Sequence, residues 1–408
     1  MVYRMKRNGA GLASICILAT MVLVMISSTA SLYFGEEDAI ENRYPRDINI
    51  RFFMRDISGI SDDRIAALQS EISAISDKYG AVPKKNYSYR CAFFAGLLDG
   101  TTVETDVAKL SSFSLDTLSD VYEFYFVPLS DYNNMMGTQE ILDDGEVLLY
   151  TDRTAYQEDT ISFNEGETFR IKKQLDGFAA NGELSAQMIS SVFLVVPDLE
   201  QAIAGLDTLT DYNGDAMVRI EWLYNFDTGI EPERQVDLYY ELRELCHDLA
   251  LSSYEVYSGY SVNSQEFERE DFYGLFGGLF YIGIILSIVF IIAAVLIIYY
   301  KQISEGYEDQ ARFEIMQKVG MTKREIRKSI NSQLLTVFFL PLIFAAMHLA
   351  FAFPIISKLL LAFNLKNVLL FALTTVVCFV AFAMFYLIVY RITSNAYYNI
   401  VSGAKEDM

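Results

Sequence analysis

Four long stretches of this 408-residue sequence contain no Asp, Glu, Lys or Arg, and they limit what the chain can fold into. They cover residues 9–33, 272–300, 332–357 and 367–390. Each is apolar and long enough to cross a hydrocarbon core of roughly 30 Å as a helix that rises about 1.5 Å per residue. The sequence therefore predicts an α-helical membrane protein with four transmembrane helices.

The charged residues are distributed very unequally around these stretches. Residues 34–271 hold 18 Lys and Arg against 46 Asp and Glu, a net charge of −28. The rest of the chain holds 14 basic and 7 acidic residues, a net charge of +7. We therefore expect residues 34–271 to form a large acidic domain, inserted between transmembrane helices 1 and 2.

The basic flanks predict the orientation, because Lys and Arg in short loops are retained on the cytoplasmic side. Three basic residues precede the first apolar stretch, and seven lie in the loop 301–331. The loop between the third and fourth stretches holds only Lys358 and Lys366. We expect both termini, including the tail 391–408, to be cytoplasmic and the acidic domain to be extracellular.

The first apolar stretch has a second interpretation. Basic residues before it and the small residues Ser28 and Ala30 near its end also occur in cleavable signal peptides. The stretch exceeds the usual apolar core of such a peptide, which is about 7–15 residues long. We favour a retained membrane anchor, and residues 1–33 are then the cytoplasmic flank and helix 1.

The acidic domain has the pattern of a mixed α/β fold. Ile48, Ile50, Phe52 and Met54 alternate with more polar neighbours, as in a half-buried strand. Further strands are expected at 87–94, 121–127, 146–150, 168–172, 192–196 and 217–222, and helices at 62–79 (after Ser61 as N-cap, with Gly80 as the stop) and 233–249. No Pro- or Ser-rich linker interrupts them, so we expect one domain, with the polar segment 261–271 as a stalk.

The sequence lacks the common catalytic signatures. It contains no G-x-x-x-x-G-K-[ST] phosphate loop, no G-x-S-x-G and no H-E-x-x-H. Its acidic clusters, such as Asp143 with Asp144, lack the spacing of a calcium loop. We expect no catalytic, metal or cofactor site, and no nucleic-acid binding.

Two residue types leave alternatives open. His348 lies in the third apolar stretch, where an ionisable side chain suggests function, but a neutral imidazole hydrogen-bonded between helices explains it as well and is favoured. Cys91 and Cys246 lie outside the apolar stretches and could form a disulfide, although two buried thiols are the simpler interpretation.

The loop between the second and third apolar stretches carries the most specific local pattern. Phe313, Met316 and Val319 are spaced for one helix face, and Glu314 with Lys318 forms a pair four residues apart. Gly320 is expected to end this helix in the left-handed conformation.

A second helix is expected immediately after Gly320. Thr322 and Glu325 match a capping box, and Met321 with Ile326 occupies the positions of a hydrophobic staple. Four basic residues follow on this helix, namely Lys323, Arg324, Arg327 and Lys328. The pattern predicts a rigid helical elbow at 301–331, which could bind a protein partner or could only contact anionic lipid.

The elbow sequence resembles a known family. Residues 301–307 (KQISEGY) and 314–326 (EIMQKVGMTKREI) are similar to the cytoplasmic segment of FtsX-like ABC transporter permeases. The resemblance is closest to the C-terminal half of bacitracin-exporter-type permeases of Firmicutes, and the order of helices is also similar to macrolide-exporter-type permeases. It covers the membrane part, whereas the acidic domain matches only in size and place.

This resemblance implies a role for the elbow. In the family it is the coupling helix that docks on a separate ATP-binding subunit, which binds the ATP, and the resulting motion is transmitted to the outer domain. The implied ATPase-coupling interface consists of Glu314, Lys318, Gly320, Met321, Thr322, Lys323, Arg324, Glu325 and Ile326.

The family also implies a setting and a set of partners. We expect a permease subunit in the plasma membrane of a Gram-positive bacterium, for export of, resistance to or sensing of antimicrobial peptides. Expected partners are the ATP-binding subunit, a second permease half or a second copy, a sensor histidine kinase, and a cationic peptide or cell-wall lipid complex as ligand.

One feature departs from the family pattern. Bacitracin-exporter-type permeases have about twice this length and two such modules, and residues 3–8 resemble the start of their second half. The chain is then a C-terminal half, a split permease or a short form that dimerises. Two other functions stay open, a membrane regulator of cell-wall hydrolases, as in FtsX itself, and a receptor that transports nothing.

Overall fold

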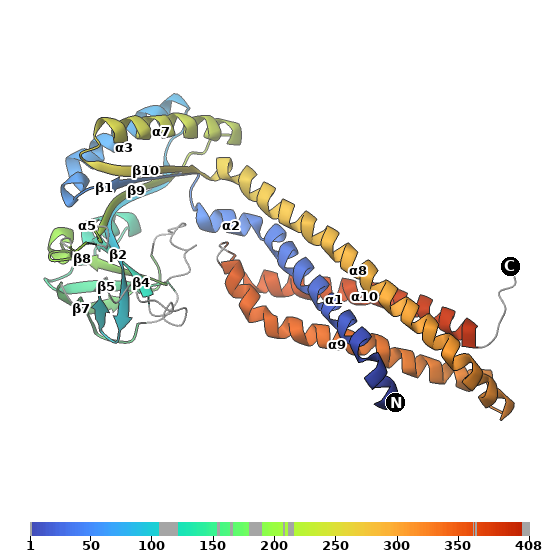
Figure 1. Cartoon of the computed structure of the whole chain (residues 1–408). Coiled ribbons are helices and arrows are strands. Elements are labelled where there is room, and N and C mark those ends of the chain that lie inside the picture. The colour runs from blue at the N-terminus through green and yellow to red at the C-terminus, as the bar shows by residue number, and fades with distance from the viewer. Residues whose placement is uncertain are drawn as a thin grey trace. The chain divides into compact units, whose positions relative to one another are not determined.

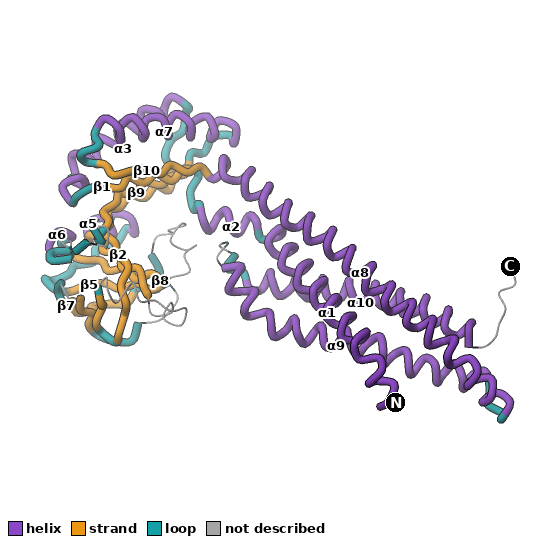
Figure 2. The backbone as a smooth tube through the Cα atoms, in the orientation of Figure 1, coloured by secondary structure: helices purple, strands orange, loops and turns teal. Residues whose placement is uncertain are grey.

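The computed structural model describes residues 2–105, 121–152, 156–163, 166–178, 190–206, 209–210, 216–361, 363 and 365–401. It divides the chain into two compact units, residues 1–38 with 272–408 and residues 39–271. Figures 1 and 2 show the elements along the chain. The first is the membrane unit and the second the α/β unit, and each is described by itself.

The α/β unit is built on one continuous sheet. The described strands are β1 (Ile48–Met54), β2 (Lys84–Asp99), β3 (Thr102–Glu104), β4 (Val121–Pro128), β5 (Glu146–Thr151), β6 (Thr160–Phe163), β7 (Thr168–Gln174), β8 (Ser190–Val196), β9 (Arg219–Asp227) and β10 (Tyr257–Ser264). Their order is β10-β1-β9-β2-β3-β6-β7-β5-β8-β4. A further pairing of β4 with β2 closes the strands from β2 to β4 into a ring.

Strand β2 belongs to both parts of the sheet. Its first half pairs with β9 in antiparallel register, for example Arg90 with Trp222. Its second half pairs with β4, from Ala92 opposite Phe126 to Leu97 opposite Val121. Before Ala92, β4 no longer accompanies β2, and the edge of β2 that faces away from β9 has no neighbouring strand among those described.

The helices of this unit pack on more than one face of the sheet. They are α2 (Glu36–Arg43), α3 (Asp62–Lys78), α5 (Leu129–Met136), α6 (Leu199–Ala202), α7 (Pro232–Ser252) and the 3-10 turn η1 (Ile57–Ile60). Tyr132 of α5 is buried with Leu148 and Val195, on the face opposite to the cluster that contains α3, α6 and α7. Helices α3 and α7 lie together over β1, β9 and β10 (Figure 1). Leu68 and Ile72 of α3 are buried in the same cluster as Leu238 and Leu242 of α7, because their spacing places each pair on one helix face.

The predicted elements of this unit are largely present. The alternation at β1 is confirmed, with the apolar residues buried and the intervening ones half-buried. The strand predicted at 217–222 begins two residues later and continues to Asp227. In the segment 261–271 that was predicted as a stalk, residues 261–264 belong to β10, which pairs with β1, and Gln265 begins α8.

The described part of the membrane unit contains four long helices. They are α1 (Val2–Phe34), α8 (Gln265–Lys318), α9 (Lys323–Leu361) and α10 (Val368–Val401). Within the described residues each contains an apolar segment long enough to cross a membrane. The expected fold class is confirmed, four membrane helices with a large mixed α/β domain inserted between the first and the second.

Many of the side chains that pack between the helices of the membrane unit are small or apolar. Ala19 and Leu23 of α1 are buried with Phe338 and Ala345 of α9. A Cβ atom added at Gly283 of α8 would lie 2.4 Å from Oγ1 of Thr29, so α1 and α8 approach closely there. Close contact through small residues is the usual packing mode between membrane helices, where apolar burial gives no net advantage.

The structure shows the surroundings of His348, Cys91 and Cys246, for which the sequence left two interpretations open. The Nδ1 atom of His348 in α9 lies 3.4 Å from Oγ1 of Thr20 in α1, which agrees with an imidazole hydrogen-bonded between helices. Cys91 and Cys246 are free, and the thiol of Cys91 donates to Oε1 of Glu221 at 3.2 Å. The described residues contain no group of His, Cys, Asp and Glu that could hold a metal ion.

Candidate functional site

The turn between α8 and α9 is a Schellman motif followed at once by a capping box. Gly320 has a φ of +105°, which favours glycine over residues with a side chain. Its N–H donates to the Gln317 carbonyl, and the Met321 N–H donates to the Met316 carbonyl, both at 3.0 Å. These two bonds satisfy carbonyls that the end of α8 would otherwise leave unpaired.

The capping box starts α9 at Lys323, five residues after α8 ends at Lys318. The Thr322 N–H donates to Oε2 of Glu325 at 2.9 Å, and the Thr322 hydroxyl donates to the same oxygen at 2.7 Å. In return the Glu325 N–H donates to Oγ1 of Thr322 at 3.4 Å. Because both helix ends are capped by neighbouring residues, the turn is fixed by local geometry.

Apolar side chains anchor this turn to the rest of the membrane unit. Ile326 and Phe313 are buried in one cluster with Tyr397 and Val401 of α10, and Met321 packs against it half-buried. The Met321 and Ile326 pair therefore occupies the staple positions with the expected burial.

A buried carboxylate adds a polar anchor. Asp309 of α8 is 2% exposed, and its Oδ2 accepts a hydrogen bond from the Tyr397 hydroxyl of α10 at 2.8 Å. Its Oδ1 lies 3.3 Å from Nη1 of Arg312. One helix turn away on α10, the Ser394 hydroxyl donates to Oδ1 of Asn331 of α9 at 3.1 Å. The sequence reasoning missed this anchor, whose partners are 88 and 63 residues apart along the chain.

The outer surface of the turn is apolar and exposed. We call residues 314–325 the α8–α9 tip. Val319 is 83% exposed, Ile315 62% and Met316 46%. Glu314 and Lys318 form an ion pair beside them, with Nζ of Lys318 3.1 Å from Oε1 of Glu314. The tip is thus a small apolar patch with charged side chains at its edge.

The structure separates the predicted interface residues into two groups. Ile326 is buried and Met321 half-buried, so their side chains serve the anchor. Gly320, Thr322 and Glu325 make the turn, whereas Glu314, Lys318 and Arg324 are exposed. The side chain of Lys323 lies outside the described residues.

Three exposed apolar residues at the tip, Ile315, Met316 and Val319, were not in the predicted interface. The sequence analysis placed Met316 and Val319 on one helix face with Phe313 and assigned Ile315 to no face. Only Phe313 of that face is buried. The signal that could have found them is the position of Val319 directly before the terminating glycine, where a helix end leaves few neighbours.

The helix that follows the tip extends beyond the elbow 301–331. The sequence predicted a helix after Gly320, and this helix, α9, continues without a break to Leu361. Pro341 and Pro354 both lie inside it. The tip is therefore a hairpin between two long helices, and each of its arms is also a membrane helix.

Four membrane helices, an α/β domain inserted after the first of them and a capped hairpin between the second and third define a polytopic membrane protein with a large inserted domain. Comparison with protein families narrows this class. Residues 284–400 match the FtsX-like permease C-terminal family, a segment that contains the tip and all of α9.

Two curated proteins of Bacillus subtilis (strain 168) are similar to this chain. The ABC transporter permease protein YxdM is 36% identical over 72 residues, which are 18% of this chain and 12% of YxdM. The uncharacterized ABC transporter permease YvcS is 26% identical over 119 residues, 29% of this chain and 17% of YvcS. The matches thus cover less than a fifth of either relative, and they support the FtsX-like family of ABC transporter permeases. The resemblance inferred from the elbow sequence is confirmed.

Proposed function

We propose that this chain is the permease subunit of an ABC transporter system and that the α8–α9 tip docks on a separate ATP-binding subunit. The observation that carries the proposal is an exposed apolar patch on a rigid turn. Val319, Ile315 and Met316 are exposed at the tip while Phe313 and Ile326, on the inner side, hold it in place. Apolar side chains surrounded by charged ones are typical of protein interfaces.

The tip is suited to transmit a displacement. Helix α8 is continuous over 54 residues from Gln265, directly after β10, to Lys318 at the tip. The Asp309 and Tyr397 hydrogen bond joins α8 to α10 close to the tip. A push on the tip by the ATP-binding subunit would then move α8 and α10 together. In this proposal ATP is bound and hydrolysed by the partner, and the chain itself is not catalytic.

The orientation of the chain is part of the proposal. Seven basic residues lie in 301–331. Such basic loops are retained in the cytoplasm, where an ATP-binding subunit would meet the tip. Both termini are then cytoplasmic, and the α/β unit faces the outside of the plasma membrane. The relatives from Bacillus subtilis support a Gram-positive origin.

The outer domain is proposed to receive cationic ligands. With a net charge of −28 in residues 34–271, the domain raises the local concentration of cations, an effect that weakens with salt. Cationic antimicrobial peptides, free or bound to cell-wall lipid, are the proposed class, for export, resistance or sensing.

Docking at the tip is tested with Val319→Asp in the full-length chain. Val368→Asp is the matched control, because Val368 is also exposed but begins α10. The readouts are the amount of ATP-binding subunit that co-purifies from native membranes and the ATPase rate of the complex. A carboxylate in the centre of an apolar interface should reduce recovery of the subunit roughly tenfold or more. The control should change neither readout.

Unchanged co-purification and unchanged ATPase rate with Val319→Asp would contradict docking at the tip. If the variant instead lost affinity only for vesicles of phosphatidylglycerol, the tip would be a lipid contact. That outcome would leave the regulator or receptor functions in place of a coupled permease.

A further inference from the structure

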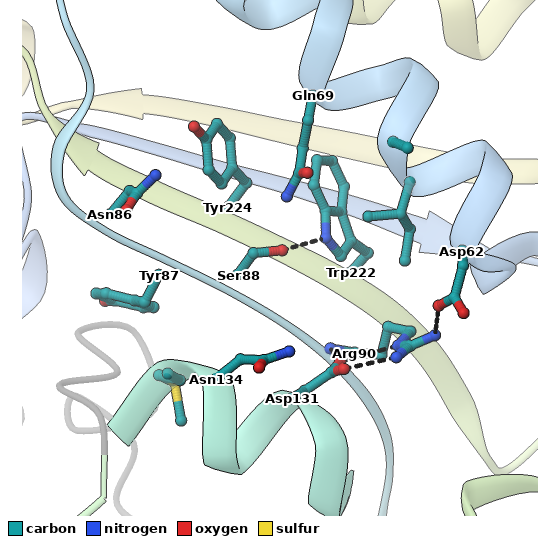
Figure 3. A pocket seen from close by; sticks show the side chains of 13 residues that line it. Asp62, Gln69, Asn86, Tyr87, Ser88, Arg90, Asp131, Asn134, Trp222 and Tyr224 are labelled. Atoms are coloured by element: carbon teal, nitrogen blue, oxygen red, sulfur yellow. Dashed lines mark hydrogen bonds and ion pairs between the residues drawn. The ribbon is translucent and has the colours of Figure 1, made fainter. Parts of the chain in front are cut away.

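The α/β unit contains a pocket that is separate from the α8–α9 tip. Its volume is about 360 Å³, and it opens where β2 and β9 lie between α3 and α5 (Figure 3). Residues from all four elements line it, so it is a built feature of the fold. It lies beside the part of β2 that β4 does not accompany.

No described strand pairs with this edge of β2, and the pocket lies there instead. At Arg90 the backbone N–H points away from β9 and donates to Oδ2 of Asp131 in α5 at 2.8 Å, where a strand would otherwise pair. Ser88 lies two residues earlier, so its backbone groups face the same side. This edge of β2 faces the pocket, with α5 on the far side.

The guanidinium of Arg90 closes one end of the pocket and connects its two helical walls. It forms two hydrogen bonds to the Asp131 carboxylate at 2.8 and 2.5 Å and one to Asp62 of α3 at 2.6 Å. Its other contacts are the Ile60 carbonyl at 3.4 Å and the Ser130 hydroxyl at 3.5 Å. These contacts use the five N–H donors of an arginine. Arg90 therefore has no donor left for an anionic ligand.

The aromatic side chains of Trp222 and Tyr224, which line the pocket, pack in the hydrophobic core. Trp222 is fully buried, and Tyr224 stacks on it with ring centroids 5.8 Å apart. The Trp222 indole N–H donates to Oγ of Ser88 at 2.7 Å. Their ring faces are thus not available for stacking on a sugar.

Three side-chain amides converge on the pocket from different elements. Gln69 comes from α3, Asn86 from β2 and Asn134 from α5 (Figure 3). Among the residues that the structure describes, none of these amides has a hydrogen-bond partner. Amides that can both donate and accept are suited to peptide groups.

The pocket is also acidic in balance. Arg90 contributes one positive charge, and Asp62 and Asp131 contribute two negative charges. The Asp62 side chain is 89% exposed, so a cation can approach it from the open side. The acidic surroundings of the whole domain add to this preference.

We infer that this pocket binds a basic side chain of an extended peptide segment, with the ligand cation at Asp62 and its backbone amides at Gln69, Asn86 and Asn134. The edge of β2 at Ser88, with which no described strand pairs, offers further backbone hydrogen bonds, as in strand addition. The inference rests on the proposed function only in placing the domain where external ligands reach it. It does not require the ATP-binding subunit.

The test uses the full-length chain in phosphatidylcholine nanodiscs and the fluorescence of Trp222, the only tryptophan of the sequence. The probe is N-acetyl-Gly-Arg-Gly-amide, and the neutral comparison is the same peptide with citrulline. We expect a saturable fluorescence change with the arginine peptide and at least tenfold weaker binding of the citrulline peptide. Asp62→Asn should weaken the arginine peptide about tenfold, because one charge-assisted hydrogen bond is lost.

Asp63→Asn is the matched control, since Asp63 is equally in the first turn of α3 but does not line the pocket. It should leave the affinity unchanged. Equal affinity for the arginine and citrulline peptides, or equal losses in the two Asp variants, would overturn the inference. Saturable binding of N-acetylglucosamine or inorganic phosphate in place of the peptide would also overturn it. The binding assay contains no nucleotide and no ATP-binding subunit. Its result is therefore independent of whether the tip docks on that subunit.

Discussion

The two units of this chain differ in where they place their large apolar side chains. In the α/β unit the largest aromatic side chains, such as Trp222, Phe124 and Phe126, are fully buried. In the membrane unit many large apolar side chains are exposed, among them Leu369 at 69% and Val377 at 66%. The difference follows from the solvent of each unit. The α/β unit is surrounded by water and buries its large apolar side chains, whereas the membrane unit is surrounded by lipid and exposes many of them.

Polar side chains also differ in placement between the two units. Ser27 and Ser31 of α1 are buried, and each donates its hydroxyl to a carbonyl one helix turn earlier, at 2.6 and 2.7 Å. In the α/β unit Arg170, Lys172 and Lys173 lie at the surface with acidic partners. Apolar burial should thus decide the stability of the α/β unit, and close packing should decide that of the membrane unit.

The largest expected effect is a cavity in the core of the α/β unit. Phe126→Ala removes a fully buried ring and should lower the free energy of unfolding by about 3–5 kcal/mol. Val376→Ala, at an exposed position of α10, should change it very little. Denaturant unfolding is followed by Trp222 fluorescence for the α/β unit and by far-ultraviolet circular dichroism for the helices of the membrane unit. Equal shifts for the two variants would remove the contrast between the units.

A charge on the exposed face of the membrane unit tests whether that face meets lipid. Val289→Lys on α8 should cost about 3 kcal/mol of insertion free energy, whereas Val82→Lys at an exposed site of the α/β unit should cost under about 0.5 kcal/mol. The amount of protein that resists carbonate extraction from membranes is the readout. If Val289→Lys accumulated like the parent chain, this face of α8 would not be lipid-exposed.

The capping box at the tip should contribute a smaller, local effect. Thr322→Ala removes the hydroxyl that receives the Glu325 N–H, at a cost of about 1 kcal/mol. Amide hydrogen exchange in the first turn of α9 should then accelerate roughly fivefold. Thr322→Ser keeps the hydroxyl and should restore protection. Loss of protection in the serine variant as well would mean that the hydroxyl is not what holds the turn.

The smallest expected effect concerns the buried thiols of the α/β unit. Burial raises the pKa of Cys91 well above its ordinary value and that of Cys246 to about 12. A raised thiol pKa keeps the neutral form, so at pH 8 only about one in ten thousand Cys246 side chains would be thiolate. Iodoacetamide should modify neither residue until the protein is denatured. Modification of the native protein at pH 8 would show that these thiols are accessible.

The sequence correctly predicted the features that depend on neighbouring residues. The uncharged stretches, the alternation at β1, and the glycine and capping box of the tip depend on residues close in sequence. The pocket and the Asp309 anchor could not be predicted in this way. Asp309 meets Tyr397 across 88 residues, and the pocket depends on where β4 stops following β2.

Strand β10 was missed for a related reason. Its residues Tyr257–Ser264 are polar and only partly buried, so no alternation marks them, and the strand forms because β1 provides a partner. The exposed apolar tip could be predicted only in part. Its turn was evident from Gly320, but the burial of Phe313 and exposure of Val319 follow from where α10 ends.

Photo-crosslinking from the tip tests the central claim most directly. A benzoylphenylalanine residue at Val319 places the reactive group in the exposed patch, and the same residue at Leu369, 69% exposed on α10, is the control. Irradiation of native membranes should attach an ATP-binding subunit to the chain from position 319 and not from 369. Crosslinks from position 319 only to lipid, or equal yields of the subunit from both positions, would contradict the assignment of the α8–α9 tip as the coupling site.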